Sequence, residues 1–133
     1  GNRMKSIPTR GILCTTRQEV LIEDNVFDNM AMASIYLSND ADDWYESGPI
    51  RDMTIRNNIF YIKDIGRTDG RATAPAIYIH PVTKGGGLPA ASNPIHKNIT
   101  IEGNTFHISN DNVVTANRVN GLKIKNNTII KVV

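Results

Sequence analysis

The stretch Val20-Leu-Ile-Glu-Asp-Asn-Val-Phe27 decides the fold, because its pattern returns three more times along the chain. In each copy apolar and polar residues alternate with a period of two, which is typical of a β-strand. Strand-length repeats of this kind predict a solenoid, in which each turn buries its apolar face against the next turn. The other copies are Met53-Thr-Ile-Arg-Asn-Asn-Ile-Phe60, Ile99-Thr-Ile-Glu-Gly-Asn-Thr-Phe106 and Leu122-Lys-Ile-Lys-Asn-Asn-Thr-Ile129.

A second set of strands lies between these copies, and it fixes the length of one turn. Its members are Gly11–Thr16, Ala33–Ser38, Ala76–His80 and Val113–Asn117. The shortest full turn, from Leu13 to Tyr36, takes 23 residues, which suits three short strands. The sequence therefore predicts an all-β fold: a right-handed parallel β-helix of four to five coils, about 23 residues each, with three loop insertions on one side. We expect residues 1–133 to form a single domain that is a fragment of a longer chain.

The strand registers also predict columns of side chains that run along the helix, because side chains alternate between the two faces of a strand. We expect an inward column of isoleucines, and a second inward stack, mostly phenylalanine, at the following bend. A third column of asparagines should adopt left-handed backbone geometry and hydrogen-bond from coil to coil. On the outside, a fourth column alternates in charge, so that neighbours should attract. In this order the columns are Ile22, Ile55, Ile101 and Ile124; Phe27, Phe60, Phe106 and Ile129; Asn25, Asn58, Asn104 and Asn127; and Glu23, Arg56, Glu102 and Lys125.

The composition argues against several classes of function. The net charge is +2, from 15 basic and 13 acidic residues, and no basic run is present, so we expect no nucleic-acid or membrane partner. No apolar stretch is long enough to span a bilayer, and the start of the chain does not resemble a signal peptide. Cys14 is the only cysteine, so it forms no internal disulfide; we expect it to be a buried small hydrophobic residue.

Function is expected where the repeat is interrupted. The three insertions, Asn39–Pro49, Asp64–Pro75 and Pro81–Asn98, all flank the strands Ala33–Ser38 and Ala76–His80. An outward strip between them should contain the polar and aromatic side chains of Tyr36, Ser38, Tyr78 and His80. Such a strip, walled by loops, is a plausible carbohydrate groove, since aromatic rings stack on sugars and polar groups bind hydroxyls.

Two histidines belong to these segments. His80 and His96 lack a metal-binding spacing, and each is expected to be a surface or turn residue.

The acidic loop after Ser38 is the best catalytic candidate. Glycoside hydrolysis needs two carboxyl groups, about 6.5–9.5 Å apart for inversion of the anomeric centre. If the loop begins extended, Asp40 and Asp42 point to one side at roughly 6–7 Å, and Glu46 could return around the turn. The competing interpretation, favoured on composition alone, is that these residues only cap turns. A calcium ion bound by the loop is a third, less favoured reading, because the spacing matches no known calcium loop.

Several motifs resemble the bacterial α-1,3-galactosidases of glycoside hydrolase family 110. They are Arg10-Gly-Ile-Leu-Cys-Thr-Thr-Arg17, Ile22-Glu-Asp-Asn-Val-Phe27, Asn39-Asp-Ala-Asp-Asp-Trp-Tyr-Glu-Ser-Gly48, Pro49-Ile-Arg-Asp-Met-Thr-Ile-Arg-Asn-Asn58 and Ile79-His-Pro81. The likeness covers most of this chain but only the C-terminal β-helical portion of such an enzyme.

The resemblance implies an inverting exo-glycosidase that removes terminal α-1,3-linked galactose and needs no cofactor. Where the family has two adjacent aspartates, this chain has Asn39 and Asp40, so Asp40 carries over as a candidate acid or base. The amide of Asn39 cannot exchange a proton in this way. Asp42 or Asp43 could supply the carboxyl group that Asn39 lacks, and Glu46 is a candidate second carboxylate. The residues expected to bind substrate are Tyr36, Ser38, Asn39, Asp43, Trp44, Arg67, Tyr78 and His80.

The resemblance also bears on partners and location. The partner would be an oligosaccharide or glycan, and the location the periplasm or the exterior of a bacterium. Separately, four or five coils would leave both ends of the helix open, and the chain ends in an apolar strand, so we also expect a dimer or missing neighbouring domains. Two alternatives remain: a carbohydrate-binding β-helix without catalysis, and a purely structural segment of a larger enzyme.

Overall fold

The computed structural model describes residues 1–39, 48–62, 74–83, 87–90, 92, 94–109 and 112–132. Within these ranges the secondary structure consists of β-strands, with no helix and hence no helix that could span a membrane. The strands are β1 (Arg3–Lys5), β2 (Ile12–Cys14), β3 (Val20–Glu23), β4 (Val26–Asp28), β5 (Ile35–Leu37), β6 (Arg51–Arg56), β7 (Ile59–Ile62), β8 (Ile77–Ile79), β9 (His96–Glu102), β10 (Thr105–Ile108), β11 (Val114–Ala116), β12 (Val119–Lys125) and β13 (Thr128–Lys131).

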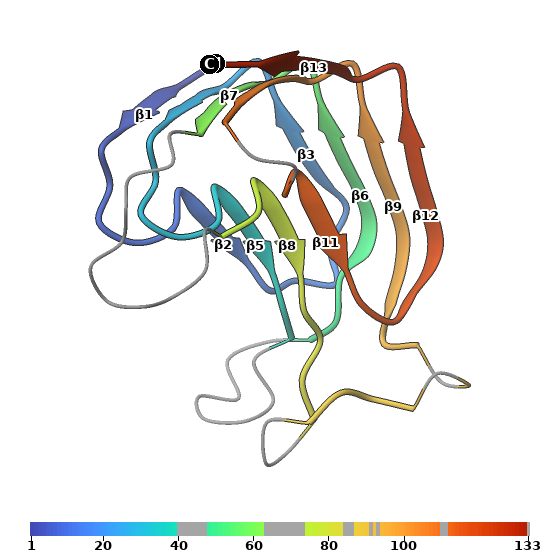
Figure 1. Ribbon diagram of the computed structural model, residues 1–133. Helices are drawn as coiled ribbons and strands as arrows, with labels where there is room; N and C mark the ends of the chain where they lie inside the picture. The colour runs from blue at the N-terminus through green and yellow to red at the C-terminus, as the bar shows by residue number, and fades with distance from the viewer. Residues whose placement is uncertain are drawn as a thin grey trace.

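These strands form three sheets whose orders are β1-β4-β7-β10-β13, β2-β5-β8-β11 and β3-β6-β9-β12. All the pairings within them are parallel. Consecutive strands along the chain enter the three sheets in strict rotation, so the chain winds around a common interior (Figure 1). This confirms the all-β parallel arrangement and is consistent with a β-helix.

The strand registers confirm the alignment of the repeats. Leu13 pairs with Tyr36, Tyr36 with Tyr78 and Tyr78 with Thr115, and the isoleucine column runs without a slip from Ile22 to Ile124. One detail was wrong: the phenylalanine column does not lie at a bend. It lies in strands β4, β7 and β10 of the five-stranded sheet, because the alternation of the repeat continues past the asparagine.

The two predicted inward columns lie in the interior, beside further buried side chains such as Leu37 and Ile79. Phe27, Phe60 and Phe106 stack with ring centroids 4.8 and 4.7 Å apart, and each is at most 1% exposed. Ile124 and Ile129 continue the columns but are 54% and 59% exposed. They differ because β12 and β13 are the last strands of their sheets, so no further coil among the described residues covers them.

The asparagine column forms a hydrogen-bonded ladder. In each coil the side-chain oxygen of the asparagine accepts both the backbone N–H and an Nδ2–H of the asparagine one coil before, at 3.0 and 3.1 Å between Asn25 and Asn58. The same pair of bonds joins Asn58 to Asn104 and Asn104 to Asn127. The ladder also extends to Asn2, which precedes Asn25 by 23 residues. The sequence analysis missed Asn2, although a step of one coil backwards would have found it.

The left-handed backbone geometry was assigned to the wrong residue of this corner. The positive φ angles belong to the residues just before the ladder: Asp24 at 58°, Asn57 at 55°, Gly103 at 65° and Asn126 at 55°. A residue in this conformation reverses the chain direction sharply, so the next side chain can point inward along the ladder. Glycine suits the third coil, because a Cβ on Gly103 would lie 2.5 Å from Asn57 Oδ1.

The outward charge column is confirmed by two ion pairs. Arg56 Nε donates to Glu23 Oε2 at 2.7 Å, and Lys125 Nζ lies 3.4 Å from Glu102 Oε2. The hydrogen bond to Glu23, followed by the charge of that carboxylate, raises the pKa of Arg56. Exposed pairs of this kind contribute little individually, so the column mainly favours correct registration of the coils.

Candidate functional site

The outer face of the sheet β2-β5-β8-β11 carries the predicted strip of aromatic and polar side chains. In β5 the side chains of Ile35 and Leu37 are fully buried, so Tyr36 between them faces outward. In β8 the same alternation buries Ile77 and Ile79 and turns Tyr78 outward. The two tyrosines are register partners in adjacent strands. The repeat therefore aligns two half-buried phenol rings on one face.

Ring contacts join these tyrosines to two basic side chains. The Tyr36 and Tyr78 centroids are 5.5 Å apart, and the Tyr78 ring stacks on His80 at 5.1 Å. At the other end, Arg10 Cζ lies 4.5 Å from the Tyr36 centroid, a cation–π distance. We call Arg10, Tyr36, Tyr78 and His80 the aromatic strip. The sequence analysis did not predict Arg10 as a member of this strip, because Arg10 lies before strand β2 and outside the repeated pattern.

The environment of the strip sets its chemistry. Desolvation, followed by the nearby Tyr36, raises the pKa of Tyr78 above its ordinary value, so its phenol stays neutral and can both donate and accept a hydrogen bond. The Nδ1 atom of His80 is buried without a hydrogen-bond partner in the described part of the chain. Stacking on Tyr78 therefore orients the His80 ring. The strip offers flat faces with polar edges, which suits a sugar ring.

Ser38 and Asn39 follow β5 and come directly before the acidic loop in the sequence, and both are buried. The Asn39 side-chain amide makes a paired contact with one backbone unit: Nδ2 donates to Val82 O, and Val82 N–H donates to Asn39 Oδ1, both at 2.8 Å. This paired contact ties the end of the β5 segment to the segment that leaves β8. Asn39 therefore acts in the described structure as a clamp between two chain segments.

Replacing Asn39 by aspartate should destabilise the fold at neutral pH by about 1–3 kcal/mol, the cost of an unsatisfied buried polar contact. A carboxylate can accept from Val82 N–H but places its second oxygen against the Val82 carbonyl. A protonated carboxyl would restore both bonds, so the loss should shrink as the pH falls. Urea unfolding at several pH values measures this. Asn39→Ala serves as the control, because alanine has no titratable group, so its loss of unfolding free energy should not shrink as the pH falls. If the losses of Asn39→Asp and Asn39→Ala varied with pH in the same way, the paired contact would be contradicted.

The remaining predicted site residues are outside the described part of the chain. They are Asp40, Asp42, Asp43, Trp44, Glu46 and Arg67. Among the described residues, no group of three or more His, Cys, Asp and Glu side chains could hold a metal ion.

His96 does not lie at the surface or in a turn, so that prediction was wrong. It is fully buried at the start of β9, where its Nδ1 accepts the Ile50 N–H at 3.0 Å. Its Nε2 has no partner in the described structure. Burial, and secondly the positive charge of Arg51, lower the pKa of His96 to about 4. The His96 ring is therefore neutral at physiological pH, and it stabilises the core by accepting the buried Ile50 N–H.

Cys14 packs against the core as a half-buried side chain, close to the prediction, and burial raises the pKa of its thiol. It has the character of a small hydrophobic residue rather than a reactive thiolate.

Comparison with known proteins shows close similarity to α-1,3-galactosidases. The chain is 42% identical over 129 residues to alpha-1,3-galactosidase A of Peterkaempfera griseoplana, covering 97% of this chain and 16% of the relative. It is 44% identical over 129 residues to the Streptomyces avermitilis protein of the same name, covering 97% and 19%. The identity to alpha-1,3-galactosidase A of Bacteroides thetaiotaomicron is 39% over 130 residues, covering 96% and 20%. No family model matches the chain.

These similarities confirm the resemblance inferred from the motifs. The chain spans only about a fifth or less of the length of the relatives it matches. It therefore corresponds to one segment of an α-1,3-galactosidase-like sequence.

Proposed function

We propose that this chain, which matches one segment of α-1,3-galactosidases over nearly its whole length, is part of a glycoside hydrolase that removes terminal α-1,3-linked galactose from a glycan. The observation that carries the proposal is the similarity itself, 42–44% identity over 129 residues to proteins of that name. The aromatic strip supports it by supplying a surface suited to a pyranose ring. The enzyme would act in the periplasm or outside a bacterial cell.

In the proposed site, the frame is a right-handed β-helix of about 23 residues per coil, and the loops beside β5 and β8 complete the groove. Tyr36, Tyr78 and His80 would contact the galactose ring. Asp43, Trp44 and Arg67 would add further contacts from the loops, while Ser38 and Asn39 hold the start of the acidic loop in place.

The proposed reaction is hydrolysis with inversion by two carboxyl groups. One carboxyl group donates its proton to the glycosidic oxygen as the bond to the anomeric carbon breaks. The other, as a carboxylate, takes a proton from a water molecule that attacks the anomeric carbon from the opposite face. We assign these roles to Asp40 together with Asp42 or Glu46.

The test is galactose release from an α-1,3-galactosyl oligosaccharide. Asp40→Asn should reduce release roughly a hundredfold or more, because removing general acid–base catalysis typically costs 10²–10⁴-fold. Asp24→Asn makes the same chemical change at an exposed corner of another part of the helix and should leave release unchanged. Equal release by the parent and Asp40→Asn would remove Asp40 from the mechanism.

A second candidate function is glycan binding without hydrolysis. The observation that favours it is the Asn39 amide, which is engaged with Val82 where the resembling family has an aspartate. Sugar-dependent stabilisation of the chain without any galactose release would select this alternative.

A further inference from the structure

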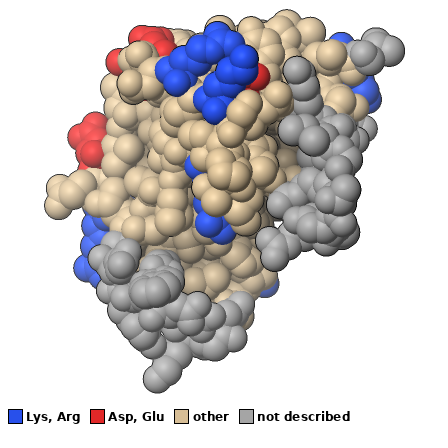
Figure 2. All heavy atoms as spheres, turned by 90° about the vertical axis from the view of Figure 1, so that its left-hand side faces the viewer, with Lys and Arg blue, Asp and Glu red and all other residues tan. Residues whose placement is uncertain are grey.

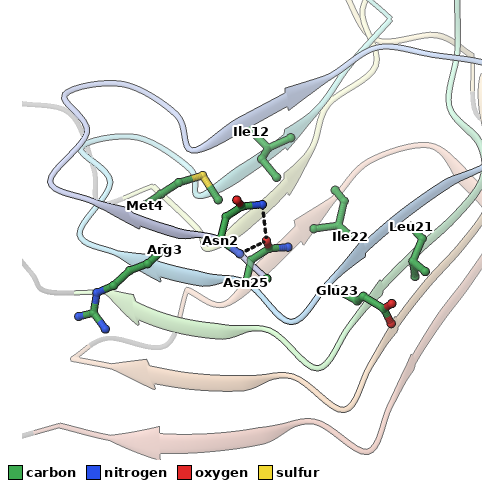
Figure 3. A pocket seen from close by; sticks show the side chains of 9 residues that line it. Asn2, Arg3, Met4, Ile12, Leu21, Ile22, Glu23 and Asn25 are labelled. Atoms are coloured by element: carbon green, nitrogen blue, oxygen red, sulfur yellow. Dashed lines mark hydrogen bonds between the residues drawn. The ribbon is translucent and has the colours of Figure 1, made fainter.

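Asn39 makes a different kind of contact from the asparagines of the ladder. The ladder asparagines bind one another, and Figure 3 shows the first such step, from Asn2 to Asn25, in a pocket lined by β1, β2 and β3. Asn39 is also buried, at 7% exposure, but its amide contacts the backbone of Val82. This contact therefore lies outside the repeated ladder, and it joins two segments that adjoin the aromatic strip.

The contact with Val82 continues the pairing of β5 with β8 beyond the ends of these strands. Directly after β8, the His80 N–H donates to Leu37 O at 2.9 Å. In a parallel ladder, the next N–H that points to the same neighbour belongs to the residue two positions on, which is Val82. The Asn39 side chain supplies the acceptor there, and its Nδ2 donates back to Val82 O. The Asn39 amide thus takes the place of a backbone peptide group and extends the pairing by one step.

His80 lies between these two fixed points on a stiff piece of chain. Pro81 follows it, so the backbone of His80 is restricted to extended conformations, and the Pro81 ring fixes its own φ angle. A displacement of Val82 would therefore be passed on to His80 rather than absorbed between them. Because side chains alternate along an extended chain, this backbone path keeps His80 on the same face as Tyr78.

The orientation of the His80 ring depends on this backbone path. The ring stacks on Tyr78 with centroids 5.1 Å apart, and its Nδ1 is buried without a hydrogen-bond partner in the described part of the chain. No described hydrogen bond at Nδ1 would hold the ring in place if the backbone moved. The extended segment from His80 to Val82 is therefore a condition for the stack on Tyr78.

The placement of this pair matters because the proposed ligand, a galactosyl glycan, carries no charge. Long-range charge attraction contributes little to binding a neutral sugar. The side of the fold shown in Figure 2 agrees with this, since uncharged residues make up most of its described surface. Affinity then depends on how closely ring faces and polar edges match the sugar, so a rotation of His80 away from Tyr78 should lower it.

From this geometry we propose that Asn39 is a positioning residue of the sugar site: by binding Val82, its amide holds His80 against Tyr78 in the arrangement that receives galactose. This role rests on the proposed function of the aromatic strip. It gives Asn39 an effect on affinity without contact between Asn39 and the sugar. An amide fits the role because the paired contact needs a donor and an acceptor on one short side chain, whereas an ionised aspartate can only accept. The amide therefore has a function at a position where the resembling family has a carboxyl group.

Proton NMR of the histidine rings, at a pH where the imidazoles are neutral, tests the positioning without any sugar. The ring current of Tyr78 shifts the stacked His80 protons upfield. We expect Asn39→Ala to move the His80 signals downfield, towards those of an unstacked histidine, because the segment is released. The signals of His107, which stacks on Tyr61 at 4.6 Å on another sheet, should not change and also show that the variant is folded. If alanine prevents folding, Asn39→Asp, which keeps one of the two bonds, gives the same readout. Unchanged His80 signals in a folded variant would overturn the proposal.

A double-mutant cycle tests the effect on binding, by calorimetry with an α-1,3-galactosyl oligosaccharide in the Asp40→Asn background. Asn39→Ala should weaken binding roughly threefold and His80→Ala roughly tenfold. Because Asn39 acts through His80, the double variant should bind as weakly as His80→Ala alone. Asn127→Ala, which breaks the two bonds from Asn104 in the ladder, should leave the affinity unchanged.

The alternatives give different results. If the losses of the two single variants multiply in the double variant, Asn39 contacts the sugar directly and the proposal is overturned. If Asp40→Asn alone does not bind the oligosaccharide, the proposed function fails and the sugar role of Asn39 fails with it. In that case the histidine signals still show whether Asn39 holds His80.

Discussion

Replacing Asn58 by alanine is expected to lower the free energy of unfolding by about 3–5 kcal/mol, because each buried hydrogen-bonding group left without a partner costs about 1–3 kcal/mol. Asn58 is 1% exposed and lies at the middle of the ladder. Its Oδ1 accepts two N–H groups of Asn25, and its Nδ2 donates to Ile22 O and to Asn104 Oδ1. Alanine removes all four contacts at once.

Urea unfolding of the purified variants measures this effect. Asn57→Gly is the matched control, since Asn57 is exposed, adjacent in sequence, and in a backbone conformation that glycine adopts freely. We expect Asn57→Gly to remain within about 0.5 kcal/mol of the parent. A loss of less than about 1 kcal/mol in Asn58→Ala would contradict a stabilising ladder.

The second large effect is a loss of stability at mildly acidic pH caused by His96. Its pKa is 6.5 in the unfolded chain and about 4 in the folded protein, where burial and then Arg51 oppose its charged form. The unfolded state therefore binds the proton more tightly. The contribution of neutral His96 to the free energy of unfolding is therefore fully present above pH 6.5. This contribution is lost progressively as the pH falls towards 4, by about 3 kcal/mol in total.

The contribution of His96 is isolated by comparison with His96→Gln, which has no titratable group at this site. Carboxyl groups titrate in both proteins at low pH, so the informative quantity is the difference between their unfolding free energies from pH 7 to pH 5. The parent should lose stability more steeply than the variant over this range. Parallel curves for the parent and His96→Gln would show that His96 is not buried in its neutral form.

The fold was largely predictable because one short pattern repeats. The alternation in Val20–Phe27 and its copies determines which side chains point inward, and the spacing determines which residues become neighbours in adjacent coils. The corner was harder, because Asn57 and Asn58 are chemically identical and only the three-dimensional path shows which takes the left-handed conformation. His96 was missed for a related reason: a polar residue at the start of a strand gives no sign that a backbone N–H inside the core needs an acceptor.

The site was less predictable than the fold. Tyr36 and Tyr78 follow from the repeat, since alternation places both on the outer face. The substrate-binding role of Asn39 stays a prediction, whereas its contact with Val82 could not be predicted, because it depends on two segments that are far apart in sequence. The contact of Arg10 with Tyr36 could not be predicted, because Arg10 lies outside the strands. Neither the two-residue alternation of a strand nor the spacing between coils says where such a side chain points.

The most direct test of the central claim, that the aromatic strip is the galactose-binding face, is the affinity of an α-1,3-galactosyl oligosaccharide for Tyr78→Ala and Tyr61→Ala. Both would be made in the Asp40→Asn background and measured by calorimetry. The two tyrosines are matched, because Tyr61 also stacks on a histidine, His107, at 4.6 Å, but on the five-stranded sheet. We expect Tyr78→Ala to weaken binding roughly tenfold, about 1.4 kcal/mol, and Tyr61→Ala to leave it unchanged. Unchanged binding in Tyr78→Ala, or an equal loss in Tyr61→Ala, would contradict the assignment of this face.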